Sequence, residues 1–152
     1  MTKTTETKHI EHVLWDFTHE KLGVYGCFEV TLGLGMANDH REIVDYVTYD
    51  KADVIRCYEI KTSYADFKSH ARKSWWGNYN YLLTTTEVYG QITGHGDTLG
   101  GLGVYIVDGD GMRSVRRSTK HQLTVGERVA IIESMVRSMD REEQKLYAVS
   151  PY

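Results

Sequence analysis

Two strand-like runs separated by only four polar residues place the strongest constraint on how this chain folds. Residues 43–49 and 54–61 are rich in β-branched and aromatic side chains, and Asp50-Lys51-Ala52-Asp53 joins them. A short polar link between two such runs predicts a β-hairpin. The two runs are therefore expected to be neighbouring antiparallel strands of one sheet.

The remaining pattern alternates between strand-like and helix-like segments. Apolar residues from Ile10 to Phe17 recur at i, i+3, i+4 and i+7, which predicts a first helix. Further strands are predicted over residues 24–32, 79–85, 102–107 and 112–116, and a glycine-rich connection is predicted over residues 86–103. This order predicts an α/β fold with one mixed β-sheet flanked by α-helices.

Two later helices are indicated by their first residues. Ser63 and Asp66 have the spacing of a capping box, which predicts a helix over residues 64–73. Thr124 begins a second such box and predicts a helix over residues 125–143. Four apolar residues of that helix are expected to face the core: Val129, Ile132, Val136 and Met139. No repeat or linker divides the sequence, so residues 1–152 are expected to form a single domain.

Composition argues against several classes of protein. The formal net charge of -3 argues against a protein that coats nucleic acid through bulk positive charge. No apolar run approaches the ~18 residues that a membrane span needs. The polar residues 1–11 carry no signal-peptide core, so we expect a cytoplasmic protein with no membrane partner. Cys27 and Cys57 lie in apolar stretches without CxxC spacing and are expected to be buried free thiols.

The predicted hairpin brings three ionisable side chains together. Because side chains alternate along a strand, Glu59 and Lys61 point to the same side, and Asp45 on the preceding strand can lie beside Glu59. Carboxylate oxygens suit a hard cation such as Mg²⁺, which polarises a phosphoryl oxygen and lowers the pKa of a bound water. Lys61 can hold or deprotonate the attacking water. On geometry alone, a solvated Glu–Lys pair with no catalytic role is an equally good interpretation.

The same residues resemble a known family. An acidic residue, a hairpin-length gap and a Glu-x-Lys triplet resemble the motif of the PD-(D/E)XK nuclease superfamily, here at Asp45, Glu59 and Lys61. Valine replaces the usual proline at position 44. The run Tyr-Glu-Ile-Lys-Thr-Ser-Tyr-Ala-Asp-Phe at residues 58–67 further resembles the MmcB-like group of DNA-repair endonucleases. The resemblance implies a restriction-endonuclease-like fold and hydrolysis of DNA phosphodiester bonds that depends on Mg²⁺ or Mn²⁺.

The resemblance also implies roles for individual positions. It assigns the metal to Asp45, Glu59 and the backbone carbonyl of Ile60, and it makes Lys61 the catalytic lysine. Members of the superfamily often add another carboxylate from the first helix or the first strand. Two candidates for it are, in order, Glu29 and Glu20.

Basic side chains near the motif are candidates for phosphate contacts. Lys68, Arg72 and Lys73 follow the motif on the predicted helix, and Arg116 belongs to a basic run near the last predicted strand. Solvated charged faces of a helix or a strand would have the same composition. DNA is the expected partner, with RNA as the alternative, and the resemblance is compatible with a homodimer.

Two other functions fit the same sequence. A catalytically inactive relative would bind nucleic acid or a protein partner, which suits the acidic net charge. A small-molecule or nucleotide-binding α/β domain would hold its ligand at the glycine-rich residues 94–101 and would be indifferent to changes at Lys61.

Overall fold

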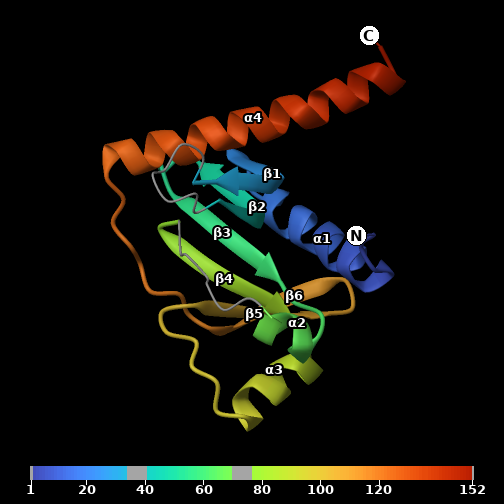
Figure 1. Ribbon diagram of the computed structural model, residues 1–152, viewed down its shortest axis with the longest axis vertical. Coiled ribbons are helices and arrows are strands. Elements are labelled where there is room, and N and C mark those ends of the chain that lie inside the picture. The colour runs from blue at the N-terminus through green and yellow to red at the C-terminus, as the bar shows by residue number, and fades with distance from the viewer. Residues whose placement is uncertain (1, 34–40, 70–76, 152) are drawn as a thin grey trace.

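A six-stranded mixed sheet forms the centre of the computed structural model, which describes residues 2–33, 41–69 and 77–151 (Figure 1). The strands lie side by side in chain order: β1 (Val24–Leu32), β2 (Glu42–Asp50), β3 (Ile55–Ile60), β4 (Tyr79–Thr84), β5 (Gly103–Asp108) and β6 (Gly111–Arg116). The pairs β1–β2, β2–β3 and β5–β6 are antiparallel, whereas β3–β4 and β4–β5 are parallel. The predicted α/β class with a mixed sheet and flanking helices is confirmed.

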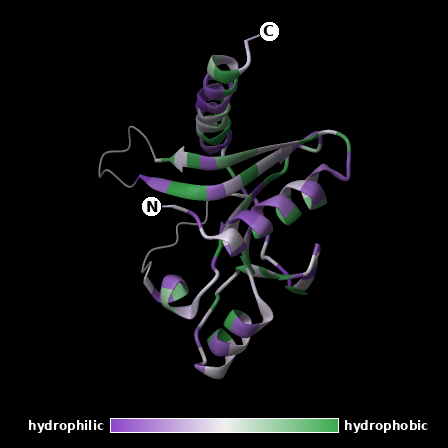
Figure 2. Ribbon diagram, turned by 90° about the vertical axis from the view of Figure 1, so that its right-hand side faces the viewer, coloured by the Kyte–Doolittle hydropathy of each residue, from purple (hydrophilic) through white to green (hydrophobic). Residues whose placement is uncertain are grey.

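Helices cover both faces of this sheet: α1 (Thr5–His19), α2 (Tyr64–Ser69), α3 (Thr86–Gly94) and α4 (Val125–Val149). Alternation along β3 sorts its side chains between the faces. Tyr58 and Ile60 pack with Leu14 of α1, whereas Cys57 packs with Met135 of α4. Figure 2 shows α1 and α4 on opposite sides of the β1–β2 ribbon. The predicted alternation of β3 is therefore confirmed, and the core lies on both sides of the sheet.

The predicted loop over residues 86–103 is wrong in its first half, because residues 86–94 form α3. Thr85 caps the helix by accepting a hydrogen bond from the backbone N–H of Val88, and Val88 and Ile92 are buried. The glycines at positions 90 and 94 lower intrinsic helix propensity, and burial of these two apolar residues overrides that cost.

The predicted buried face of α4 is only partly correct, because Ile132 and Met139 pack against the core whereas Val129 and Val136 do not. The helix buries Ile131, Ser134, Met135 and Ser138, while Val129 and Val136 are exposed and Ile132 and Met139 are half-buried. Small serine side chains let α4 approach β1 closely, and the Ser138 hydroxyl donates to the backbone carbonyl of Glu29 at 3.4 Å. Hydropathy alone does not identify such a face. Within the described part of the chain, no helix is both long and apolar enough to cross a membrane.

Candidate active site

The strands β2 and β3 diverge at Asp45, and this divergence creates the site. Their ladder of paired residues ends at Tyr46 and Tyr58. One step further, Oδ2 of Asp45 accepts a hydrogen bond from the backbone N–H of Ile60 at 2.7 Å. A side-chain carboxylate therefore takes the place of a strand carbonyl, and it is held between the two strands.

Glu59 lies next to this carboxylate and hydrogen-bonds to it. Burial raises the pKa of Glu59 from its ordinary value of 4.5 to about 9, and the charge and hydrogen bond of Asp45 add to the shift. The nearby Lys61 ammonium opposes that shift, and Glu42 at the start of β2 adds to it. Without a cation, Glu59 is therefore expected to be protonated at neutral pH.

Lys61 follows directly after β3, and its backbone is fixed by β4. Its N–H donates to the carbonyl of Leu83 at 2.9 Å, and its carbonyl accepts from the Thr84 hydroxyl at 2.7 Å. The side chain is only 6% exposed, and its ammonium lies 3.6 Å from Oδ1 of Asp66 on α2. The N–H of Asp66 donates to the Ser63 hydroxyl at 3.1 Å, so the first turn of α2 positions this carboxylate. The capping spacing predicted from the sequence is thus present on the serine side.

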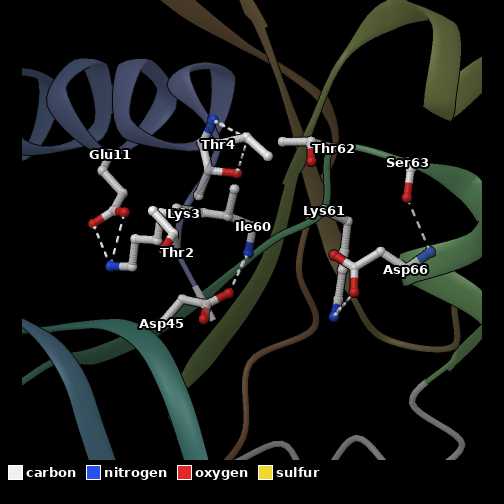
Figure 3. A pocket seen from close by; sticks show the side chains of 11 residues that line it. Thr2, Lys3, Thr4, Glu11, Asp45, Ile60, Lys61, Thr62, Ser63 and Asp66 are labelled. Atoms are coloured by element: carbon white, nitrogen blue, oxygen red, sulfur yellow. Dashed lines mark hydrogen bonds and ion pairs between the residues drawn. The ribbon is translucent and has the colours of Figure 1, made fainter.

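A hollow of about 480 Å³ opens beside these residues (Figure 3). Asp45 and Lys61 reach it from the sheet, and Asp66 reaches it from α2. The opposite wall comes from the N-terminal segment and α1, namely Thr2, Lys3, Thr4, Thr7 and Glu11. Glu59 is not part of this lining, and it meets the site through its hydrogen bond to Asp45.

Glu29 lies across from Asp45 on β1. The pairs on either side, Phe28 with Tyr46 and Val30 with Val44, place these two acidic residues opposite each other. Glu29 has a φ of 55°, a left-handed conformation that is rare for a residue other than glycine. At this kink the alternation of side chains along β1 is interrupted, so Cys27 and Val30, which are three positions apart, both pack toward α4. The sequence gives no sign of this φ.

The Glu29 carboxylate is paired with Lys3. The Lys3 ammonium lies 3.0 Å from Oε1 of Glu29 and 2.9 Å from Oε1 of Glu11. Glu11 is thus the α1 carboxylate that lines the hollow, whereas Glu20 only caps the C-terminal end of α1. We did not predict Glu11. The sequence feature that could have indicated Glu11 is its position directly after Ile10, which is buried on α1.

The donor set at the diverging strands fits a hard divalent cation. Asp45 and Glu59 provide carboxylate oxygens, and the backbone carbonyl of Ile60 is the third donor that the sequence resemblance implies. Across the residues that the structure describes, no group of three or more His, Cys, Asp or Glu side chains is arranged to hold a metal. Mg²⁺ commonly uses one or two carboxylates and keeps several waters, so the pair is sufficient. A cation there would also offset the burial and the Asp45 charge that together raise the pKa of Glu59.

The basic residues that we predicted to contact phosphate lie in different surroundings. The Lys68 ammonium binds Oδ1 of Asp97 at 2.8 Å, so a phosphate would have to compete with that carboxylate. Arg116 ends the edge strand β6 and donates to the backbone carbonyl of Gly100 at 2.6 Å. Arg72 and Lys73 lie outside the described residues. For all four, nucleic-acid contact stays a prediction.

Comparisons with known proteins give information about the fold alone. No family model matches the chain, and no curated protein matches it significantly. Among solved structures, the SPO1766 protein of unknown function from Silicibacter pomeroyi superposes with a TM-score of 0.70, at 18% sequence identity and over 93% of each chain. At this identity the likeness shows a shared fold.

Proposed function

We propose that this protein is a metal-dependent nuclease that hydrolyses DNA phosphodiester bonds at Asp45, Glu59 and Lys61. The observation that supports it best is a nearly buried ammonium close to two adjacent carboxylates, at the point where two strands diverge. Burying a lysine is costly unless its charge is compensated, and the Asp66 carboxylate that faces it is 43% exposed. A purely structural ion pair gains little from such an arrangement.

The three residues would divide the work by their chemistry. Asp45 and Glu59 would hold Mg²⁺ or Mn²⁺ together with the Ile60 carbonyl. The bound cation supplies Lewis acidity toward a phosphoryl oxygen and toward water. Lys61 would donate hydrogen bonds to the attacking water and to the negative charge that develops on the phosphoryl group. Asp66 would orient the lysine toward the hollow.

A catalytically inactive relative that binds nucleic acid or protein is the second candidate. The acidic net charge favours it. Both candidates use the same surface, and only the cleavage reaction separates them.

The test is cleavage of end-labelled single-stranded, duplex and branched DNA, with Mg²⁺, with Mn²⁺ and with EDTA. Lys61→Met keeps the buried stem of the side chain and removes its charge, so it is expected to fold and to lose about 100-fold or more in rate. Asp45→Asn is expected to abolish metal-dependent cleavage. Lys21→Met in the exposed turn after α1 is the matched control and should cleave like the wild type.

Two results would overturn the nuclease proposal. One is the absence of metal-dependent cleavage on every substrate, which would favour the inactive relative if the protein still binds DNA. The other is cleavage that survives in Lys61→Met, in Lys61→Ala and in EDTA, which would place the reaction elsewhere or in a contaminant. Circular dichroism of each variant separates lost chemistry from lost folding.

A further inference from the structure

The N-terminal segment forms one wall of the hollow beside the candidate site. Residues 2–4 precede α1, lie in no helix or strand, and form the N-terminal strap. Figure 3 shows Lys3 of this strap on one side of the hollow and Lys61 on the other. The strap is fixed where it enters α1, because the Thr4 hydroxyl accepts a hydrogen bond from the backbone N–H of Thr7 at 3.1 Å. The candidate site is therefore walled on both sides.

Lys3 fastens the N-terminal strap to two elements of the fold. Its ammonium donates to Oε2 of Glu11 at 3.0 Å and lies 3.0 Å from Oε1 of Glu29. Glu11 belongs to α1 and Glu29 to β1, so one side chain joins the strap to a helix and to a strand. Burial lowers the pKa of Lys3, but the hydrogen bonds to both carboxylates outweigh burial and raise that pKa above its ordinary value of 10.5. The ammonium therefore stays charged and the strap stays fastened at neutral pH.

The hollow has the size of a small-molecule pocket. Its volume of about 480 Å³ lies within the range of about 300–1,000 Å³ that holds one small ligand. A space of this size takes one nucleotide unit and does not take a duplex. Lys61 lines the hollow and its side chain is only 6% exposed, so a scissile phosphate has to enter the hollow to reach the ammonium.

The stiffness of DNA then distinguishes between substrates. A duplex has a persistence length of about 150 base pairs, so it meets the protein as a nearly straight rod and bends into a small hollow only at a cost in free energy. A single strand turns at each nucleotide, and its backbone follows a groove of the protein without that cost. A hollow with a wall on each side therefore favours an unpaired strand.

The side chains that line the hollow suit the backbone of such a strand. Five of them carry hydroxyl groups: Thr2, Thr4, Thr7, Thr62 and Ser63. Hydroxyl and lysine side chains are typical contacts to phosphate and sugar. The described lining contains no aromatic side chain on which a base could stack. The sugar-phosphate backbone is thus expected to lie in the hollow, with the bases directed outward.

We propose that the substrate of this site is single-stranded DNA, which rests on the nuclease function, and that Lys3 enforces this choice by fastening the N-terminal strap. The Lys3 ammonium is bound to Glu11 and Glu29, so Lys3 is a specificity-determining residue and not a catalytic one. Its contact with Glu29 is partly exposed, at 38% for Lys3 and 47% for Glu29, and exposed ion pairs contribute modestly. Release of the strap is therefore expected to change strand selectivity by about threefold to tenfold.

The first experiment compares kcat/KM for one end-labelled DNA strand, alone and annealed to its complement, with Mn²⁺. The wild type is expected to cut the single strand at least about tenfold faster. Lys3→Met keeps the length of the side chain and removes both ion pairs. The ratio of the two rates should then fall by about threefold to tenfold, because the duplex gains more from the released strap. Lys8→Met is the matched control, since Lys8 is exposed on α1 outside the hollow, and it should keep the wild-type ratio.

Glu11→Gln tests the same contact from its other side. It should lower the ratio in the same direction as Lys3→Met, and the double variant should lower it no further than Lys3→Met alone, because both changes remove one shared interaction. Effects that add in the double variant would contradict a role through this contact. Thermal unfolding followed by circular dichroism checks that each variant is folded.

A binding measurement separates the choice of strand from the cleavage reaction. Fluorescence anisotropy with Lys61→Met in Mn²⁺ should give a lower dissociation constant for the single strand than for the duplex. If no DNA is cut in any assay, the nuclease function fails, and tighter binding of the single strand would still support the choice of strand. Cleavage of the duplex at an equal or higher rate, or equal or tighter binding of the duplex, would overturn the single-stranded substrate. An unchanged ratio in Lys3→Met would overturn the role of the strap.

Discussion

At Asp45, a hydrogen bond of the fold and a candidate metal ligand belong to the same carboxylate. Oδ2 satisfies the N–H of Ile60, which would otherwise lack a partner where β2 and β3 diverge. Loss of this acceptor would leave a buried donor unsatisfied, which costs about 1–3 kcal/mol. Substitutions at Asp45 therefore alter stability and chemistry together, whereas those at Lys61 alter mainly the chemistry.

The raised pKa of Glu59 makes stability depend on pH. Between the unfolded value of 4.5 and the folded value of about 9, the folded state binds a proton that the unfolded state has lost, so stability falls as pH rises through this window. Glu59→Gln cannot lose that proton. In EDTA it is expected to raise the melting temperature near pH 8 by at least about 2 °C. Thermal unfolding followed by circular dichroism measures this.

The same comparison near pH 4 is the internal control for Glu59. Both the wild type and Glu59→Gln then carry an uncharged side chain, so their melting temperatures should agree. A variant that is less stable than the wild type at pH 8 would contradict the assignment of a protonated Glu59. Adding Mn²⁺ should stabilise the wild type more than the variant if Glu59 is a ligand.

The central residues of the candidate site were predictable, and its periphery was not. Asp45, Glu59 and Lys61 belong to one short hairpin, so alternation alone brings Asp45 and Glu59 together. Glu11 and Lys3 line the hollow because α1 packs on the face of the sheet opposite the one that α4 covers. That placement depends on tertiary packing, which local sequence patterns do not encode.

Some features of the helices could be predicted from the sequence and others could not. The capping box of α4 was predicted correctly, because capping residues act through local hydrogen bonds. The helix α3 was missed because its two glycines suggested a loop. The buried face of α4 was assigned to four apolar residues, but the face that is buried includes Ser134 and Ser138, which hydropathy does not select.

A three-residue contact joins α2 to the end of α3. Asp97 accepts hydrogen bonds from the Tyr64 hydroxyl at 2.6 Å and from the Lys68 ammonium at 2.8 Å, and the Lys68 contact is the main cause of its lowered pKa. A lowered pKa stabilises the fold above the unfolded value and loses that effect as pH falls through the folded value. Asp97→Asn is therefore expected to lower the melting temperature at neutral pH and to have a smaller effect below pH ~4.

The control for this contact is Asp110→Asn. Asp110 is almost fully exposed in the turn between β5 and β6, so its loss should leave the melting temperature unchanged. A loss of stability in Asp97→Asn that is the same at both pH values would mean that the charge of Asp97 does not contribute.

Across the whole molecule, the antiparallel half of the sheet followed from sequence and the parallel half did not. The hairpin was predicted from its four-residue link, whereas a parallel β4–β5 pair requires a crossover helix, and α3 was not predicted. The mixed sheet was nonetheless expected from the alternation of elements, and it is present.

With a net charge of -3, the protein is expected to contact few DNA phosphates, so its DNA affinity should depend only weakly on salt concentration. Lys3 and Lys61 line the hollow, Lys68 lies on α2, and all three are paired with carboxylates. Contact with two or three phosphates predicts a slope of about −2 to −3 for log K against log salt. Fluorescence anisotropy with labelled duplex DNA in EDTA measures it. A slope near −8 would instead mean that the protein coats the phosphate backbone.

The hairpin of β2 and β3 and the first turn of α2 form one continuous segment, which matters for the evolution and the engineering of the candidate site. All the charged groups that define the candidate chemistry, from Asp45 to Asp66, occupy one continuous stretch of chain. The other strands and helices support that stretch without contributing to the triad. Such a segment can be transplanted as a unit into another sheet that has a parallel neighbour for Lys61, and the surrounding scaffold can diverge widely while the chemistry is kept.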